Sequence, residues 1–282
     1  MKCTTQLGRL WLCFQVLMGL VTSRGFSLFA RNTAASSKTE WNSHSCLSRA
    51  EAYEQLETFL QETDASATFQ IQGWRWHTMS LARQAERLQQ LALRRPHDTA
   101  LIQRAVNHVV GFNMKALHQI ETDLFFPWVR KQISAKNPVV GSAIHVILEE
   151  LEELRQSVQI LGSQMNQDAT LVASSSDPAV LSIAECSAQV AQQTRSMLHL
   201  ENTYLVPTIA RLIPETDQKS FNNQVIRNLG IWDSRLHLVG MYEAISGDPV
   251  EMKLFEQIIP SLARKMIPRW KRLLYEPVAG DW

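Results

Sequence analysis

Two stretches, Glu121-Thr-Asp-Leu-Phe-Phe-Pro127 and Glu201-Asn-Thr-Tyr-Leu-Val-Pro207, share one pattern: a glutamate, five residues with an apolar run, and a proline. Each follows a histidine in a helical pattern, His77 for the first stretch and His145 for the second. A repeated histidine-then-glutamate unit in a helical chain can supply imidazole and carboxylate ligands to a metal ion inside a helix bundle. The functional prediction therefore depends on whether these four side chains face one another.

The composition of the chain predicts an all-α protein. Its 282 residues include only 11 glycines, and Leu, Ala, Gln, Glu and Arg recur at helical spacing after Ser48. Neither a glycine-rich phosphate-binding motif nor a long alternation of polar and apolar residues occurs. The formal net charge of +1 gives no support for binding to nucleic acid, which usually needs a basic surface.

The N-terminal part of the chain differs in character from the rest. Two basic residues precede the apolar stretch 10–21, which predicts a signal peptide over residues 1–25. Residues 26–47 are rich in Ser and Thr and have no acid before Glu40, which is typical of a transit-like or disordered leader. A two-part leader of this kind resembles that of plastid proteins in algae with secondary plastids; secretion and mitochondrial import stay open. No later stretch reaches about 18 apolar residues, so no transmembrane span is expected.

Helix start and stop signals divide the remainder into a bundle over residues 48–212 and C-terminal helices over residues 213–282 that pack on it. A short helix with Ser48 as its N-cap is expected first, over residues 49–63. The expected long helices span residues 72–92, 99–131, 138–165 and 177–212, and two amphipathic helices follow over residues 216–246 and 249–275.

Helical phase places both glutamates on apolar stripes. At 100° per residue, Glu121 lies about 40° from Leu117 and Glu201 lies about 40° from Met197, so the two acids occupy equivalent places. Burying an unpaired carboxylate is costly. Each glutamate is therefore expected to be protonated, paired with a cationic group or bound to a metal ion.

The histidines differ in how well they fit a shared site. His77 lies on the face of Leu81, Leu88 and Leu91, and His145 lies at the edge of an apolar stripe. A lone histidine on an apolar face is more often a hydrogen-bonded core residue than a ligand. The order His, Glu, His, Glu, with one residue per helix, nevertheless favours a shared site.

The same count places four further side chains. His118, one turn before Glu121, is a candidate for an additional ligand or for a residue that holds a ligand in place. Tyr204, one turn after Glu201, is a candidate to hydrogen-bond a ligand carboxylate or to line a pocket. His199 is expected to be exposed, and His108 to lie at the surface or between helices.

Over about residues 70–212, the chain resembles the hemerythrin-like (HHE cation-binding) domain. The resemblance lies in the His77 helix, the Glu121-x5-Pro127 unit, the His145 helix and the Glu201-x5-Pro207 unit. The resemblance implies an up-down four-helix bundle that holds a non-haem di-iron centre with histidine and carboxylate ligands. It also implies reversible O₂ binding, sensing of oxygen or iron, or handling of nitric oxide and peroxide damage. The family's bridging glutamates match Glu121 and Glu201, and its lone histidines match His77 and His145.

The chain departs from the family at two positions. Members usually have a histidine four residues before each glutamate, and here those positions hold Leu117 and Met197. Two imidazole ligands are therefore missing, unless His118 replaces one of them. The leading expectation is a metal-binding protein with a reduced ligand set, which holds one or two iron ions and binds O₂ or another small diatomic molecule. A role in binding or sensing is favoured over that of an enzyme.

Two alternatives stay open. Leu117 and Met197 are residues that fill a core, so the bundle can be a degenerate one that has lost its metal and serves as a scaffold or interaction module. In that case Glu121 and Glu201 would be hydrogen-bonded to His77 and His145. A di-iron oxidase or peroxidase is the other alternative, and it would need an open coordination position and an access channel.

Overall fold

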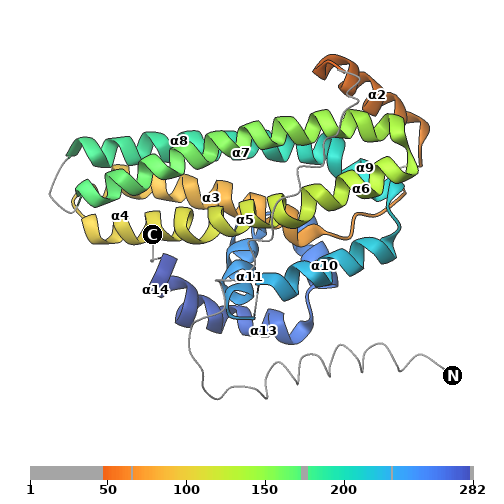
Figure 1. Ribbon diagram of the computed structural model, residues 1–282. Helices are drawn as coiled ribbons and strands as arrows, with labels where there is room; N and C mark the ends of the chain where they lie inside the picture. Colours follow the sequence, from red (N-terminus) through yellow and green to blue (C-terminus); the bar gives the residue numbers. More distant parts are fainter. Residues whose placement is uncertain (1–46, 65, 173–176, 230, 280–282) are drawn as a thin grey trace, which may run out of the picture. The chain divides into compact units, whose positions relative to one another are not determined.

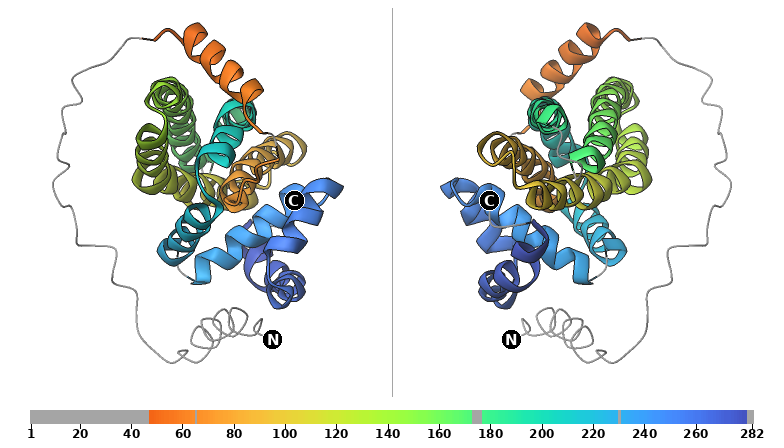
Figure 2. Two further views of the ribbon diagram at one scale, coloured as in Figure 1. Left: turned by 90° about the vertical axis from the view of Figure 1, so that its right-hand side faces the viewer. Right: turned by 90° about the vertical axis from the view of Figure 1, so that its left-hand side faces the viewer.

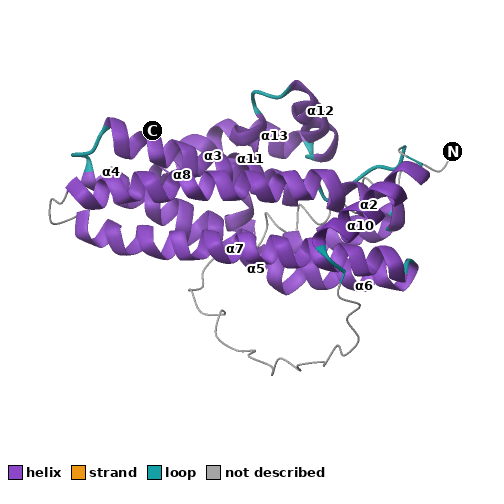
Figure 3. Ribbon diagram, turned by 90° about the horizontal axis from the view of Figure 1, so that it is seen from above, coloured by secondary structure: helices purple, strands orange, loops and turns teal. Residues whose placement is uncertain are grey.

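Every regular element in the described part of the chain is a helix (Figure 3), which confirms the prediction of an all-α protein. This computed structural model describes residues 47–64, 66–172, 177–229 and 231–279. Among these residues, no helix is long and apolar enough to cross a membrane. The expected signal peptide and all but the last residue of the expected leader lie outside the described residues.

Four long helical segments pack along one another, and they are called the bundle below (Figures 1 and 2). The first segment is α3 (Gln72–Arg94) and the third is α7 (Pro138–Val172). The second consists of α4 (Thr99–Val106), η1 (Asn107–Met114), α5 (Lys115–Ile120), η2 (Glu121–Phe125) and α6 (Phe126–Lys136). The fourth consists of α8 (Asp177–Leu200), η3 (Glu201–Leu205) and α9 (Val206–Leu212). Helix α8 packs against both α3 and α7, and α7 also packs against α4 and α6.

The ends of these segments follow local signals in most places. The short helix α2 (Arg49–Glu62) begins at the predicted capping box, in which the Ser48 N–H donates to a Glu51 carboxylate oxygen at 2.8 Å. The third segment continues to Val172, past its expected end at Met165. The extension is explained by Ala169 and Val172, which are buried on the same helical stripe as Met165.

The shared glutamate-to-proline spacing produces a π-helical turn. In η2 the N–H of Phe126 donates to the carbonyl of Glu121, five residues back, and Pro127 follows directly. A proline has no N–H to donate, and its ring clashes with the carbonyl four residues before it. A wider turn relieves that clash, so the proline explains why the helix widens at this point.

The same turn occurs before two other prolines. In η3 the N–H of Val206 donates to the carbonyl of Glu201 before Pro207. In η4 (Lys271–Tyr275) the N–H of the following residue donates to the carbonyl of Lys271 before Pro277. The third copy begins with a lysine instead of a glutamate. The five-residue spacing before a proline therefore reflects the backbone geometry of the π-helical turn. Of these three turns, only η2 and η3 begin with a carboxyl group that could bind a ligand.

The C-terminal helices are shorter than the sequence predicted. They are α10 (Glu215–Leu229), α11 (Ile231–Ile245), α12 (Pro249–Ile258), α13 (Ser261–Trp270), η4 and α14 (Glu276–Ala279). The helix expected over residues 249–275 is interrupted at Pro260, because a proline disfavours helical geometry in the residue before it. Ile259 accordingly has extended φ and ψ of −85° and 127°. These helices form a second apolar core around Trp76, Phe255, Ile267 and Tyr275.

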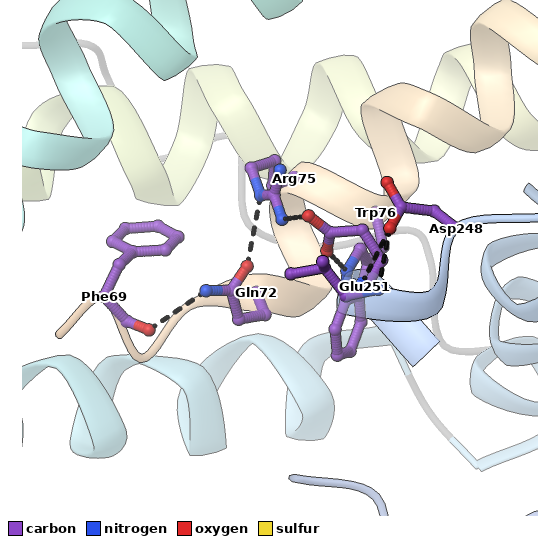
Figure 4. Close-up of polar contacts among 7 residues, drawn as sticks. Phe69, Gln72, Arg75, Trp76, Asp248 and Glu251 are labelled. Atoms are coloured by element: carbon purple, nitrogen blue, oxygen red, sulfur yellow. Dashed lines mark hydrogen bonds and ion pairs between the residues drawn. The ribbon is translucent and has the colours of Figure 1, made fainter. Parts of the chain in front are cut away.

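A buried ion pair anchors the C-terminal helices on α3 (Figure 4). The carboxylate of Glu251 in α12 accepts hydrogen bonds from the guanidinium of Arg75 and, at 2.8 Å, from Nε1 of Trp76. Asp248 caps α12 by accepting from the N–H of Glu251 at 3.2 Å, which fixes where α12 begins. Gln72 completes the contact by accepting from Arg75 Nε at 3.1 Å.

Helix α11 also approaches α3 closely, at Gly240. A Cβ atom built on Gly240 would lie 2.8 Å from Ser80 Oγ on α3. We expect Gly240→Leu to lower the free energy of unfolding by about 1–3 kcal/mol, because the larger side chain forces the two helices apart. Urea unfolding monitored by circular dichroism measures this effect. Gly111→Leu is the matched control, since a Cβ on exposed Gly111 meets nothing within 4 Å; an equal loss in both variants would contradict the proposed close approach.

Candidate metal centre

The interior of the bundle contains five buried polar side chains, which are called the interior cluster below; electrostatic interactions link Glu121 with Glu201 and His77 with His118. Its members come from α3, η1, α5, η2 and η3, and each is at most 4% exposed: His77, Asn113, His118, Glu121 and Glu201. Several of their polar atoms have no hydrogen-bond partner, namely His77 Nε2, Asn113 Nδ2, His118 Nε2, Glu121 Oε2 and both carboxylate oxygens of Glu201. Buried polar atoms are normally hydrogen-bonded, and each one left without a partner costs about 1–3 kcal/mol.

Glu121 is buried at the start of η2. Its Oε1 accepts a hydrogen bond from Trp74 Nε1 at 3.3 Å. Burial raises the pKa of Glu121 to about 8, and the Trp74 hydrogen bond and the charge of Arg155 only partly oppose that rise. In the metal-free protein this carboxyl is therefore mainly protonated at neutral pH.

Glu201 occupies the equivalent place at the start of η3. Burial raises the pKa of Glu201 well above its usual range, and the negative charge of Glu121 raises it further. Arg75 and the hydroxyl of Thr78 act in the opposite direction, although that hydroxyl donates to the Trp74 carbonyl at 3.4 Å. The two carboxyls are thus within electrostatic reach of each other. A divalent cation between them would favour the ionised form of both.

His77 is held as a neutral imidazole. Burial lowers the pKa of His77 to about 4, against the effect of a hydrogen bond with the side chain of Asn113. Nε2 of the same ring has no partner. Metal-binding histidines are commonly neutral, with one ring nitrogen held by a protein group and the other facing the metal.

His118 lies beside a buried arginine. Burial lowers the pKa of His118 to about 3, and the charges of Arg155 and His77 lower it further. Arg155 reaches this position from α7, where it donates to the carbonyl of His118 at 3.3 Å and also to Thr122 and Glu152. The side chain of Arg155 thus reaches the level of His118 from α7.

The structure does not bring His145 to the interior cluster. His145 precedes Arg155 by ten residues on α7, which corresponds to about 15 Å along the helix axis at 1.5 Å per residue. Its side chain is 35% exposed, and its Nε2 lies 3.1 Å from Glu149 Oε1. Helical phase specifies the face of a helix that a residue occupies but not the height at which the residue lies along the neighbouring helices.

The other predicted positions are divided between the core and the surface. Leu117 and Met197 are both fully buried in the apolar core, and His199 is exposed, as predicted. Tyr204 donates to Glu57 Oε1 at 3.1 Å and stacks on Tyr53 with ring centroids 5.0 Å apart. It therefore lines a surface pocket beside α2 and makes no hydrogen bond to Glu201.

Sequence reasoning missed three residues of this region. Arg155 continues the helical spacing of Leu148 and Leu151, so its place on the stripe was a usable signal. Asn113 gave no comparable signal, because the π-helical stretch η1 shifts the phase around it. His237 of α11 had no signal at all, yet its ring centroid lies 4.4 Å from that of His77. His108 was expected either at the surface or between helices, and the structure places it between helices. Its ring lies edge-on to the ring of Tyr275, with centroids 5.2 Å apart.

The donor types of the interior cluster suit a metal ion, but the present positions of its side chains do not form a metal site. Two carboxylates and neutral imidazoles are the donors that iron, manganese and zinc prefer. Within the described residues, however, no three or more His, Cys, Asp or Glu side chains are grouped so that they could hold a metal ion as they stand.

No family model, curated protein or solved structure matches this chain.

Proposed function

We propose that the chain is a hemerythrin-like protein, whose up-down four-helix bundle binds a divalent transition metal, foremost iron, at the interior cluster. Glu121, Glu201, His77 and His118 would hold the ion. The observation that carries the proposal is that these four buried side chains present oxygen and nitrogen atoms with no partner in the protein. An iron ion there would supply a coordination position for O₂ or another small diatomic molecule.

The proposed ligand set differs from the one that the resemblance implies. His118 follows directly after Leu117, where the family has a histidine, and its buried Nε2 has no partner. It therefore replaces His145, whose imidazole lies next to Glu149. Asn113 would orient His77, and Trp74 would orient Glu121 through its hydrogen bond.

A second candidate function is a metal-free scaffold. The fully buried Leu117 and Met197 favour it, because they fill the places of two family ligands with core side chains. The hydrogen bonds expected in that case from the glutamates to His77 and His145 are not formed, since Glu201 has no partner and Glu121 accepts from Trp74. Both glutamates would instead stay protonated in the core, and the bundle would present its surface or its C-terminal helices to a partner.

Metal binding by the purified full chain separates the two candidates. The protein would be stripped with a chelator and titrated anaerobically with Fe(II), Mn(II) and Zn(II). We expect at least about one equivalent of iron per chain, and an affinity at least tenfold weaker in the Glu121→Gln/Glu201→Gln variant, because ligand carboxylates are lost.

The matched control replaces two exposed acids, Glu185→Gln/Glu256→Gln, which changes the net charge equally outside the cluster. Circular dichroism verifies that every variant is folded. Binding below about a tenth of an equivalent in the wild type, with no difference among the variants, would favour the scaffold.

A further inference from the structure

His237 of α11 is buried without any hydrogen-bond partner. Its residue is 2% exposed, and neither Nδ1 nor Nε2 has a partner. The ring stacks on Phe112 with centroids 4.2 Å apart and planes at 10°. A core imidazole normally satisfies at least one nitrogen, so two unpartnered nitrogens next to the interior cluster require an explanation.

The docking of α11 on α3 explains how His237 reaches the bundle. His237 and Gly240 lie three residues apart and share a face of α11, while His77 and Ser80 have the same spacing on α3. The close approach of Gly240 to Ser80 therefore sets His237 against His77 one turn away. Helix α11 packs against α3, and Figure 1 shows α11 beside the bundle helices.

The rings of His77 and His237 are in contact, at a separation that two ligands of one ion can have. Their centroids are 4.4 Å apart and their planes are inclined by 57°, so the rings are not stacked on each other. Two imidazoles bound at about 2.1 Å and at right angles around one metal would have centroids about 4.5 Å apart. His77 Nε2 and both nitrogens of His237 have no protein partner.

His108 is close by but is separated from this pair. Its ring stacks on the Phe112 ring at 5.5 Å, and Phe112 in turn stacks on His237. Among the described residues, the ring contacts of His108 are with Phe112 and Tyr275, and none is with His77 or His237. His108 is therefore not assigned to the pair, although its Nε2 also lacks a partner.

We propose that His237 is a metal ligand supplied from outside the bundle, which together with His77 forms an imidazole pair at the proposed metal centre. This inference rests on the proposed function. It restores part of the imidazole count lost at Leu117 and Met197. It also gives the C-terminal helices a role, because they complete the metal site. A donor set richer in imidazole favours iron, zinc or cobalt over magnesium and calcium.

The test uses Co(II) as a spectroscopic probe and Fe(II) for affinity, both with the full chain. The variants are His237→Phe, which keeps a ring stacked on Phe112, and His237→Gln. We expect each to weaken Fe(II) binding by about 10–100-fold, because an inner ligand is lost, and to change the visible spectrum of bound Co(II). Control variants His108→Phe and His199→Gln are expected to retain the wild-type affinity and spectrum.

The outcomes distinguish this inference from the proposed function. Wild-type affinity and an unchanged Co(II) spectrum in both His237 variants would overturn the role of His237 and leave metal binding at the cluster standing. A wild-type protein that binds no metal would overturn both proposals. If neither variant folds in chelator, ring-nitrogen NMR of the Zn(II)-loaded wild type replaces the comparison: a metal-shifted nitrogen of His237 supports the inference, and an unshifted one overturns it.

Discussion

In the metal-free protein, Glu121→Gln is expected to raise the free energy of unfolding by about 4 kcal/mol at pH 8 and by less than about 1 kcal/mol at pH 5. Burial raises the pKa of Glu121 from 4.5 to about 8, so the native state binds more protons than the unfolded state between these values. The stability of the wild type must therefore fall as the pH rises through this window. Glutamine is uncharged at every pH, so the variant escapes that loss.

Urea unfolding in chelator at pH 5 and pH 8 measures this difference. Glu185→Gln, an exposed substitution on α8, is the control and is expected to show the same small effect at both values. If Glu121→Gln has no larger effect at pH 8 than at pH 5, the ionised carboxylate of Glu121 must be stabilised inside the protein. The positive charge of Arg155 would then be the first group to test as its partner.

The buried histidines have the opposite effect on the free energy of unfolding, which they lower as the pH falls below about 6.5. Burial lowers the pKa of His77 and His108 to about 4 and that of His118 to about 3. The native state then binds fewer protons than the unfolded state as the pH falls below 6.5, and stability is lost. Together with the glutamates, these groups place the expected stability maximum of the metal-free protein near pH 6–7.

Glu251→Ala is expected to lower the free energy of unfolding by about 3–5 kcal/mol, because it leaves Arg75 buried without its counter-charge. The side chains of Arg75 and Glu251 are only 13% and 11% exposed. The substitution also removes the acceptor of the Trp76 Nε1 hydrogen bond, which lies in the second apolar core. Loss of this anchor should release the C-terminal helices from α3 before the bundle unfolds.

Chemical unfolding and amide hydrogen exchange test this second prediction. Faster exchange is expected in α11 and α12, with the bundle helices less affected. Glu251→Gln is the control, since it keeps an acceptor for Trp76 while removing the charge, and it should cost less. A loss below about 1 kcal/mol for Glu251→Ala would show that the apolar core alone holds these helices.

The positions of many helices could be predicted because local signals encode them. The capping box at Ser48 and the Asp248-Pro249 start act within one turn of chain, and both begin helices where expected. The apolar periodicity likewise indicated that Glu121 and Glu201 would be buried, and both are fully buried. The π-helical turns were not foreseen, although Pro127 and Pro207 explain them.

The composition of the interior cluster could be predicted only in part. Periodicity specified which face of its helix His145 occupies. The position of His145 along the bundle axis relative to Glu121 depends on the register between α7 and its neighbouring helices. In the structure, Arg155 of α7 reaches that position and donates to the carbonyl of His118. His237 reaches His77 because α11 docks at Gly240, a contact between segments far apart in the sequence.

By itself, the sequence determined that this protein is helical and that Glu121 and Glu201 are buried, because helical period and side-chain polarity act locally along the chain. Only the tertiary structure decided the surroundings of the imidazoles: His77 and His118 are buried, the His237 ring lies 4.4 Å from the His77 ring, and His145 lies beside Glu149 with 35% of its side chain exposed. The physical reason is that helix-to-helix register and the docking of α11 depend on side-chain packing between distant segments, which no single helix encodes.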